Sequence, residues 1–134
     1  LDFIREYFPE CTRVAAYATT KAIERKTDEE LRKLREHGLA LVYIGLESGN
    51  EELLLKFNKG VTAAETVKNA LRCKAAGIAI SVTAINGMAG LNGDWQAHAI
   101  DTAKAVSAMK PEFIAFLTLR VYSGTPLHDW IPPI

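Results

Sequence analysis

Residues 42–49 read Val-Tyr-Ile-Gly-Leu-Glu-Ser-Gly, an apolar run with one internal glycine that ends in a carboxylate, a hydroxyl and a second glycine. A near-continuous apolar run is typical of a strand buried inside a parallel sheet. In an α/β sheet, ligands bind just beyond the carboxyl ends of such strands. We therefore expect Glu47 and Ser48 to lie where a binding group belongs.

The composition permits one hydrophobic core and indicates no special class of partner. The 134 residues are 49% hydrophobic, and 16 Lys plus Arg balance 16 Asp plus Glu. This balance gives no signal for a nucleic acid or a membrane surface, and no apolar run approaches the roughly 18 residues of a membrane span. Cys11 and Cys73 have no CxxC partner, which fits a reducing cytosol and predicts buried or inert thiols. We therefore expect a cytoplasmic protein.

Four strand-like runs alternate with helix-like segments. The helix starts are marked by capping boxes at Thr27 and Thr62 and by the N-cap residues Asn50 and Asp94. This alternation predicts parallel βαβ units. The strand-like runs are residues 14–18, 41–47, 78–85 and 113–119, and residues 2–7 read as an opening helix.

Four such units make half of a (β/α)8 barrel, which typically needs about 250 residues. We therefore interpret residues 1–134 as a single α/β segment, a partial (β/α) barrel of four parallel strands that belongs to a larger barrel. A half-barrel has open strand edges at both ends, so we expect possible self-association through those edges.

Polar residues follow the predicted strands at their carboxyl ends, where barrel active sites form. A carboxylate there can accept hydrogen bonds from both hydroxyls of a ribose or from an ammonium group, and a lysine supplies a point charge for a carboxylate or phosphate. These residue types suit a small, zwitterionic, sugar-bearing ligand. The candidate residues are Tyr17, Thr19, Glu47, Ser48, Lys59, Thr83, Gly87, Arg120 and Tyr122.

Several of these candidates also have a purely structural interpretation. Glu47 could cap the short helix that follows it, and Lys59 could complement the C-terminus of that helix. Gly87 could be an ordinary turn residue. Arg120 ends an apolar strand and calls for an anionic partner, which a structural salt bridge would also satisfy.

The residues give little support for other kinds of site. No GxSxG elbow is present, and residues 87–93 match neither the Rossmann fingerprint nor the Walker A loop. The three histidines lack the spacing of a zinc site. We predict that they are surface or loop residues; they are His37, His98 and His128.

Taken in order, several segments resemble the radical S-adenosylmethionine enzymes. Residues 43–49 (YIGLESG), with 51–54 and 58–62 after them, resemble the fourth-strand motif and following helix of that family. Residues 83–90 resemble its fifth-strand GxIxGxxG motif, with Thr83 in place of the first glycine. Residues 116–127 resemble the sixth strand and its PGTP-type loop, and residues 14–23 the third strand. The closest branch contains coproporphyrinogen dehydrogenase-like and methylthiotransferase-like proteins.

The resemblance implies that the chain corresponds to strands three to six of the family's barrel and assigns a role to each candidate residue. Glu47 would bind the ribose of S-adenosylmethionine, and Lys59 its methionyl carboxylate. Tyr17 or Thr19 would lie near the methionyl amino group. Ile85 would pack on the adenine, with Thr83 and Gly87 shaping that edge, while Arg120 and Tyr122 would face the cofactor or substrate side of the barrel.

The chain lacks the family's cluster-binding segments. The family's first strand is followed by a CxxxCxxC loop that holds a 4Fe–4S cluster, and its second by a GGE-type turn; these 134 residues contain neither. Cys11 and Cys73 alone cannot build a cluster, whose irons need thiolates at close spacing. We therefore expect the cluster only in a longer parent, and we expect this chain alone to be inactive.

The leading hypothesis is the central-to-C-terminal part of the catalytic domain of a radical S-adenosylmethionine oxidoreductase or transferase. The alternative is a non-catalytic nucleotide-binding or half-barrel assembly module. An aldolase-type barrel fragment is a weaker third hypothesis, because only Lys21 lies near a strand end as a Schiff-base lysine. The substrate is not indicated by these residues.

Overall fold

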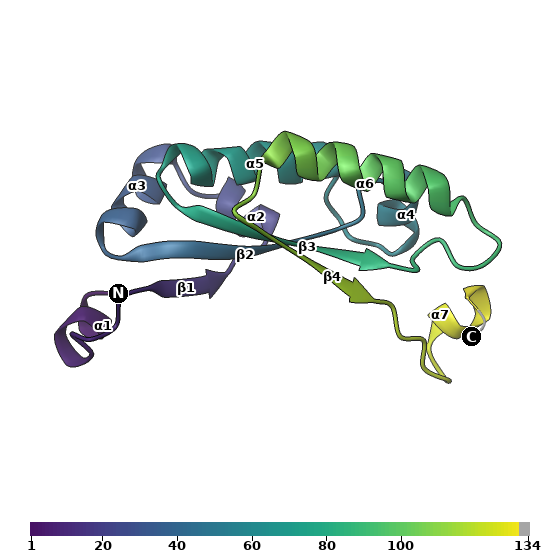
Figure 1. The fold of residues 1–134 in the computed structure, drawn as a ribbon, viewed down its shortest axis with the longest axis horizontal. Helices are drawn as coiled ribbons and strands as arrows, with labels where there is room; N and C mark the ends of the chain where they lie inside the picture. Colours follow the sequence, from purple (N-terminus) through teal and green to yellow (C-terminus); the bar gives the residue numbers. More distant parts are fainter. Residues whose placement is uncertain (132–134) are drawn as a thin grey trace.

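The computed structural model describes residues 1–131 as strands and helices that alternate along the chain (Figure 1). Residues 132–134 of the predicted segment 1–134 lie outside the described residues. The strands are β1 (Val14–Tyr17), β2 (Leu39–Glu47), β3 (Ala79–Asn86) and β4 (Phe113–Thr118). The helices are α1 (Asp2–Tyr7), α2 (Thr20–Glu24), α3 (Asp28–Glu36), α4 (Glu51–Lys56), α5 (Ala63–Ala75), α6 (Trp95–Met109) and α7 (Pro126–Trp130).

The strands form one sheet in the order β1-β2-β3-β4, and every neighbouring pair is parallel. Sheet order therefore follows chain order, and each strand–helix unit adds its strand beside the preceding one. The predicted strand ranges differ from the observed ones by at most two residues at either end. The expected α/β class and partial barrel of four parallel strands are confirmed.

The predicted helix starts are also confirmed. At the start of α3, the Thr27 hydroxyl accepts the Glu30 amide at 3.1 Å, and the Glu30 carboxylate accepts the Thr27 amide at 2.7 Å. The box at Thr62 repeats this arrangement at the start of α5, and Asp94 caps α6. Caps of this kind satisfy backbone N–H groups that a helix start leaves unpaired.

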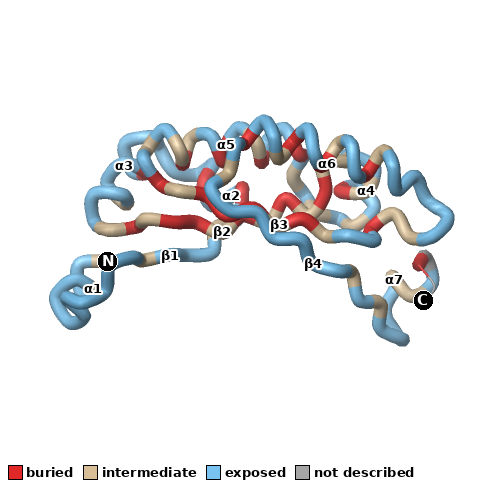
Figure 2. Tube along the Cα trace, in the orientation of Figure 1, coloured by how far each residue is buried: buried red, intermediate tan, exposed pale blue. Residues whose placement is uncertain are grey.

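The helices α3, α5 and α6 cover one face of the sheet and leave the other face bare (Figure 1). The main core lies between the two layers, where alternate side chains of β2 and β3 are buried against the helices (Figure 2). These include Val42, Ile44, Ile80 and Val82, each 3% exposed or less. Burying one such side chain contributes about 1.5–3 kcal/mol. On the bare face, Tyr17 is 90% exposed, and β4 is exposed along its whole length.

The edge strand β4 is tied to β3 by a carboxylate. Glu112 Oε2 accepts the backbone amide of Ile80 at 2.8 Å, and the Glu112 amide donates to the Ile80 carbonyl at 3.1 Å. Lys74 of α5 donates to the other carboxylate oxygen of Glu112. The hydrogen bond from the Ile80 amide, with that from Lys74, holds the pKa of Glu112 below its usual value.

Two short helices, α2 and α7, are missing from the sequence-based prediction. Each has five residues, too few for an apolar periodicity to mark it. Local signals are present, because Thr19 accepts the Ala22 amide at 3.1 Å and Pro126 occupies the first turn of α7. Within residues 1–131, none of the helices has the length and apolar character needed to cross a membrane.

Candidate functional site

An irregularity at the carboxyl end of β2 organises the site. Between Gly45 and Glu47 the pairing with β3 shifts by one residue, which is a β-bulge. Glu47 has a φ of +65°, and the Ser48 amide donates to the Leu46 carbonyl at 2.8 Å. These features match a γ-turn of positive φ, which is the rare and strained form. A left-handed non-glycine residue costs about 1–3 kcal/mol and persists only where its surroundings enforce it.

The bulge places the Glu47 carboxylate over Gly45. A Cβ atom added at Gly45 would lie 2.3 Å from Glu47 Oε1 and 3.3 Å from Lys59 Nζ, so only a glycine leaves this space open. Lys59 Nζ donates to Glu47 Oε1 at 3.1 Å, and the two side chains are 26% and 25% exposed. Glu47 and Lys59 therefore form a half-buried ion pair above the glycine.

The interpretation of Glu47 as the cap of α4 is wrong. Asn50 caps α4, because its Oδ1 accepts the Leu53 amide at 3.1 Å. The Lys59 ammonium pairs with Glu47 and not with the end of α4, although the Lys59 amide donates to the Leu54 carbonyl at 2.9 Å. The two side chains of the ion pair thus lie together at the strand ends.

A cavity of about 420 Å³ opens over this ion pair at the carboxyl ends of β1 and β2. It brings together four predicted site residues, namely Tyr17, Thr19, Glu47 and Lys59. The Tyr17 ring lies 5.1 Å from the ring of Tyr43, a further wall residue. The Thr19 hydroxyl already caps α2, so it is less available to a ligand than Tyr17.

Lys21 also lines this cavity and is absent from the predicted site. Its Nζ lies 3.4 Å from the position of a Cβ added at Gly60. Within residues 1–131, the Lys21 ammonium makes no hydrogen bond or ion pair, although its charge contributes to lowering the pKa of Glu65, whereas Lys59 is held by Glu47. The sequence places Lys21 near the end of the first strand, where its only predicted role is that of a Schiff-base lysine. The cavity therefore holds one carboxylate and two ammonium groups.

Ser48 and His98 lie behind the Glu47 turn, within the core. Ser48 is fully buried, and its Oγ lies 2.8 Å from His98 Nδ1. His98 is 8% exposed on α6, so the prediction that it is a surface or loop residue is wrong. Sequence spacing alone could not reveal this contact, because Ser48 and His98 are 50 residues apart.

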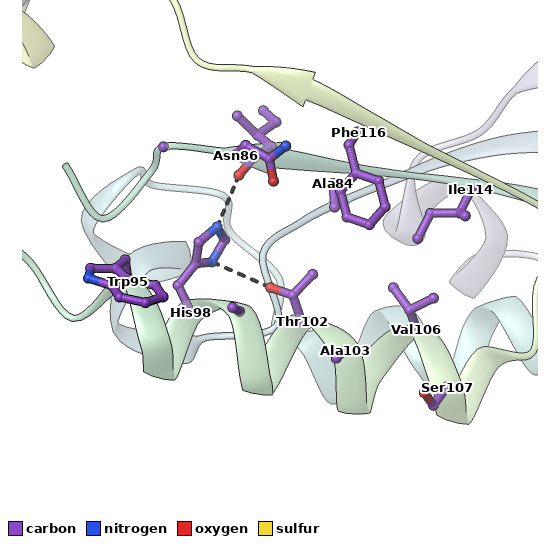
Figure 3. Close-up of a pocket in the computed structure, with 13 residues that line it drawn as sticks. Ala84, Asn86, Trp95, His98, Thr102, Ala103, Val106, Ser107, Ile114 and Phe116 are labelled. Atoms are coloured by element: carbon purple, nitrogen blue, oxygen red, sulfur yellow. Dashed lines mark hydrogen bonds between the residues drawn. The ribbon is translucent and has the colours of Figure 1, made fainter. Parts of the chain in front are cut away.

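A larger cavity, about 580 Å³, lies between α6 and β4 on the helix-covered side of the sheet (Figure 3). Its walls are mostly apolar and include Val106, Ile114 and Phe116. This is the position where the next helix of an α/β unit packs, so we interpret the cavity as uncovered packing surface. Ile85 and Gly87 border this cavity and not the one over Glu47.

The other predicted site residues line neither cavity. Thr83 pairs with Gly45 in the sheet, one strand away from Glu47. Arg120 and Tyr122 follow β4, and Tyr122 is 64% exposed. Over residues 1–131, neither of these two side chains makes a hydrogen bond or an ion pair, so an anionic partner for Arg120 is not found there.

The cysteines do not fit an iron–sulfur cluster. Cys73 is a buried residue of α5, and burial raises the pKa of its thiol to about 11. Cys11 is exposed and follows α1. No group of three or more His, Cys, Asp or Glu side chains able to hold a metal ion occurs in the part of the chain that the structure describes. A cluster would need ligands from elsewhere.

The sequence profile of the radical SAM superfamily matches residues 9–103. The chain belongs to the radical SAM superfamily. The matched residues include β1, β2 and β3 and all the residues that line the cavity over Glu47. A search of curated protein sequences finds no significant match.

Several solved structures share the fold. Methylornithine synthase gives a TM-score of 0.73 at 20% identity, over 94% of this chain and 34% of its own. The methyltransferase TsrM from Kitasatospora setae, with cobalamin and a 4Fe–4S cluster bound, gives 0.68 at 22%, over 92% and 24%. Coproporphyrinogen III oxidase from Escherichia coli gives 0.65 at 15%, over 86% and 25%. The chain thus spans about a third or less of these proteins.

Proposed function

We propose that this chain supplies the S-adenosylmethionine-binding strand ends of a radical SAM catalytic barrel, as strands three to six of that barrel. The observation that carries the proposal is the Glu47–Lys59 ion pair, which lies over Gly45 in a cavity at the carboxyl ends of β1 and β2. Superfamily membership supports the choice of ligand. The parent protein would be an iron–sulfur oxidoreductase or transferase.

The charges in the cavity fit the groups of this ligand. The Glu47 carboxylate can accept hydrogen bonds from the two ribose hydroxyls, in the space that Gly45 leaves open. Lys21 and Lys59 offer ammonium groups to the methionyl carboxylate, and in the described part of the chain only the Lys59 ammonium is held by an ion pair, with Glu47. Tyr17 or Thr19 would lie near the methionyl amino group.

The other predicted residues extend the same assignment. The adenine would lie toward β3, where Ile85 packs on it and Thr83 and Gly87 shape its edge. Arg120 and Tyr122 would face the substrate side. Bound S-adenosylmethionine supplies the sulfonium bond whose reductive cleavage starts the chemistry of this family. The cysteines of this chain do not fit the 4Fe–4S cluster that delivers the electron, so its ligands belong to other segments.

Binding of S-adenosylmethionine to the complete natural polypeptide that carries this chain tests the proposal. Isothermal titration should show that Glu47→Gln weakens binding by about 10- to 100-fold, the effect of losing a hydrogen bond to a charged group. Glu52→Gln is the matched control, because Glu52 is an exposed carboxylate of α4 outside the cavity. Equal affinities for the wild type and Glu47→Gln would refute the assignment of Glu47.

A half-barrel assembly module is the second candidate, and the exposure of β4 favours it. Phe113, Phe116 and Leu117 are 52%, 58% and 54% exposed on this edge strand. Edge strands of this kind pair with other chains. Sedimentation analysis should then show a concentration-dependent dimer that Phe116→Lys dissociates, while Tyr7→Lys, an exposed aromatic of α1, leaves it intact. A monomer at all concentrations would remove this candidate.

A further inference from the structure

The turn that carries Glu47 is anchored to α6 by a buried histidine. His98 Nε2 lies 3.0 Å from the Ile85 carbonyl oxygen, and His98 Nδ1 lies 2.8 Å from Ser48 Oγ (the Ile85 contact is drawn in Figure 3). A carbonyl oxygen can only accept, so Nε2 carries the proton. Nδ1 then accepts from the Ser48 hydroxyl. One ring thus joins the backbone of β3 to the residue directly after Glu47.

Further contacts join the same turn to α6. Ser48 Oγ accepts the Asn50 amide at 2.9 Å. Thr102 Oγ1 accepts the Gly49 amide at 3.0 Å, and Asn50 Nδ2 donates to Asp101 Oδ2 at 3.0 Å. The backbones also meet closely, because a Cβ added at Gly49 would lie 2.2 Å from the Asp101 carbonyl oxygen.

These contacts supply what the conformation of Glu47 requires. A positive φ of +65° at a glutamate is unfavourable and needs surroundings that fix it. Glu47 itself has one side-chain partner, Lys59, which the ligand would compete for. The residues after Glu47 are instead held from the helix layer, on the face of the sheet opposite to the cavity.

We propose that His98 is a positioning residue that acts through Ser48 and sets the direction of the Glu47 carboxylate. This inference rests on the proposed function, because it assumes that Glu47 binds the ligand. His98 does not line the cavity over Glu47, so it reaches a ligand there only through the turn. Loss of the imidazole leaves Ser48 Oγ with only the Asn50 amide as its hydrogen-bond partner within residues 1–131 and lets the strained turn relax.

The test compares three variants of the complete natural polypeptide that carries this chain. His98→Leu fills the position with an apolar side chain and removes the contacts of the imidazole with Ile85, Ser48 and Thr102, whereas His98→Gln keeps an acceptor and a donor. Asn69→Leu is the matched control, because Asn69 is a buried polar residue of α5 whose partners are the Glu65 carbonyl and Arg72.

We expect His98→Leu to weaken binding of S-adenosylmethionine by about 10-fold, corresponding to one hydrogen bond. His98→Gln should restore the affinity to within about threefold of the wild type, and Asn69→Leu should leave it unchanged even where it lowers the melting temperature as much as His98→Leu does. Wild-type affinity in a folded His98→Leu variant, or an equal loss in Asn69→Leu, would overturn the inference.

A double-mutant cycle separates positioning from general destabilisation. If His98 acts through Glu47, His98→Leu should weaken binding little further in a protein that already carries Glu47→Gln. Multiplicative losses would show that His98 acts independently and would overturn the inference. Failure of the proposed function looks different, because then the wild-type protein binds no S-adenosylmethionine and Glu47→Gln has no effect.

Discussion

Replacement of Gly45 by alanine should abolish most ligand binding while leaving the fold intact. The new Cβ would lie 2.3 Å from Glu47 Oε1, and ordinary contact begins near 3.4 Å, so the carboxylate must retreat by about 1.1 Å. The end of a flexible side chain can move at little cost. Alanine also gains about 0.5–1 kcal/mol over glycine in a strand, which offsets a half-exposed ion pair worth up to about 1 kcal/mol.

The expected result is a free energy of unfolding within about 1 kcal/mol of the wild type, because these two small terms oppose each other. The affinity for S-adenosylmethionine should fall by about 10- to 100-fold, because the displaced carboxylate loses its hydrogen bond to the ligand. Urea titration and isothermal titration measure the two quantities on one preparation. Ala115→Ser, in the same cross-strand row as Gly45, is the control. Unchanged affinity in Gly45→Ala would refute the reasoning.

Three further predictions concern stability and reactivity. Iodoacetamide should modify exposed Cys11 in the native protein but reach Cys73, whose pKa burial raises to about 11, only after unfolding; equal native rates would contradict this. Because the pKa of Glu112 is lowered in the folded protein, its stabilising effect is present above the unfolded value of about 4.3 and is lost as pH falls through the folded value. As the pH falls below about 4, the free energy of unfolding of Glu112→Gln should therefore decrease less than that of the wild type in urea titrations. An equal decrease with pH in the two proteins would count against this prediction. Gly49→Ala should lower the free energy of unfolding by about 1–3 kcal/mol, because its Cβ would lie 2.2 Å from the Asp101 carbonyl oxygen. A urea-unfolding midpoint equal to that of the wild type would disprove the close approach.

The strands and the longer helices could be predicted because their signals are local. The capping boxes at Thr27 and Thr62 lie within four residues of sequence, and the structure contains both. The runs of β2 and β3 could be recognised because most of their residues are apolar, including those that pack against the helices. Helices α2 and α7 escaped prediction because one turn and a half carries no periodic pattern.

The candidate site was predicted in part. The chain placed Glu47 and Lys59 only twelve residues apart, and strand-end reasoning included both. The amino-acid sequence did not indicate the positive φ of Glu47, since that backbone conformation depends on the register shift between β2 and β3. The role of His98 depends on a contact across 50 residues of sequence, which no local pattern encodes.

The agreement between sheet order and chain order bears on how the chain folds during synthesis and on which segment forms the cavity over Glu47. Each strand pairs with the one synthesised just before it, so a growing chain can complete one unit before the next emerges. The paired residues of neighbouring strands are nevertheless separated by the whole intervening helical segment, and such non-local parallel pairing is intrinsically slow to form. The cavity over Glu47 draws all of its walls from residues 17–61. The side chains of these walls therefore lie in one contiguous stretch, whereas the backbone turn that directs Glu47 is fixed from outside that stretch, by β3 and α6.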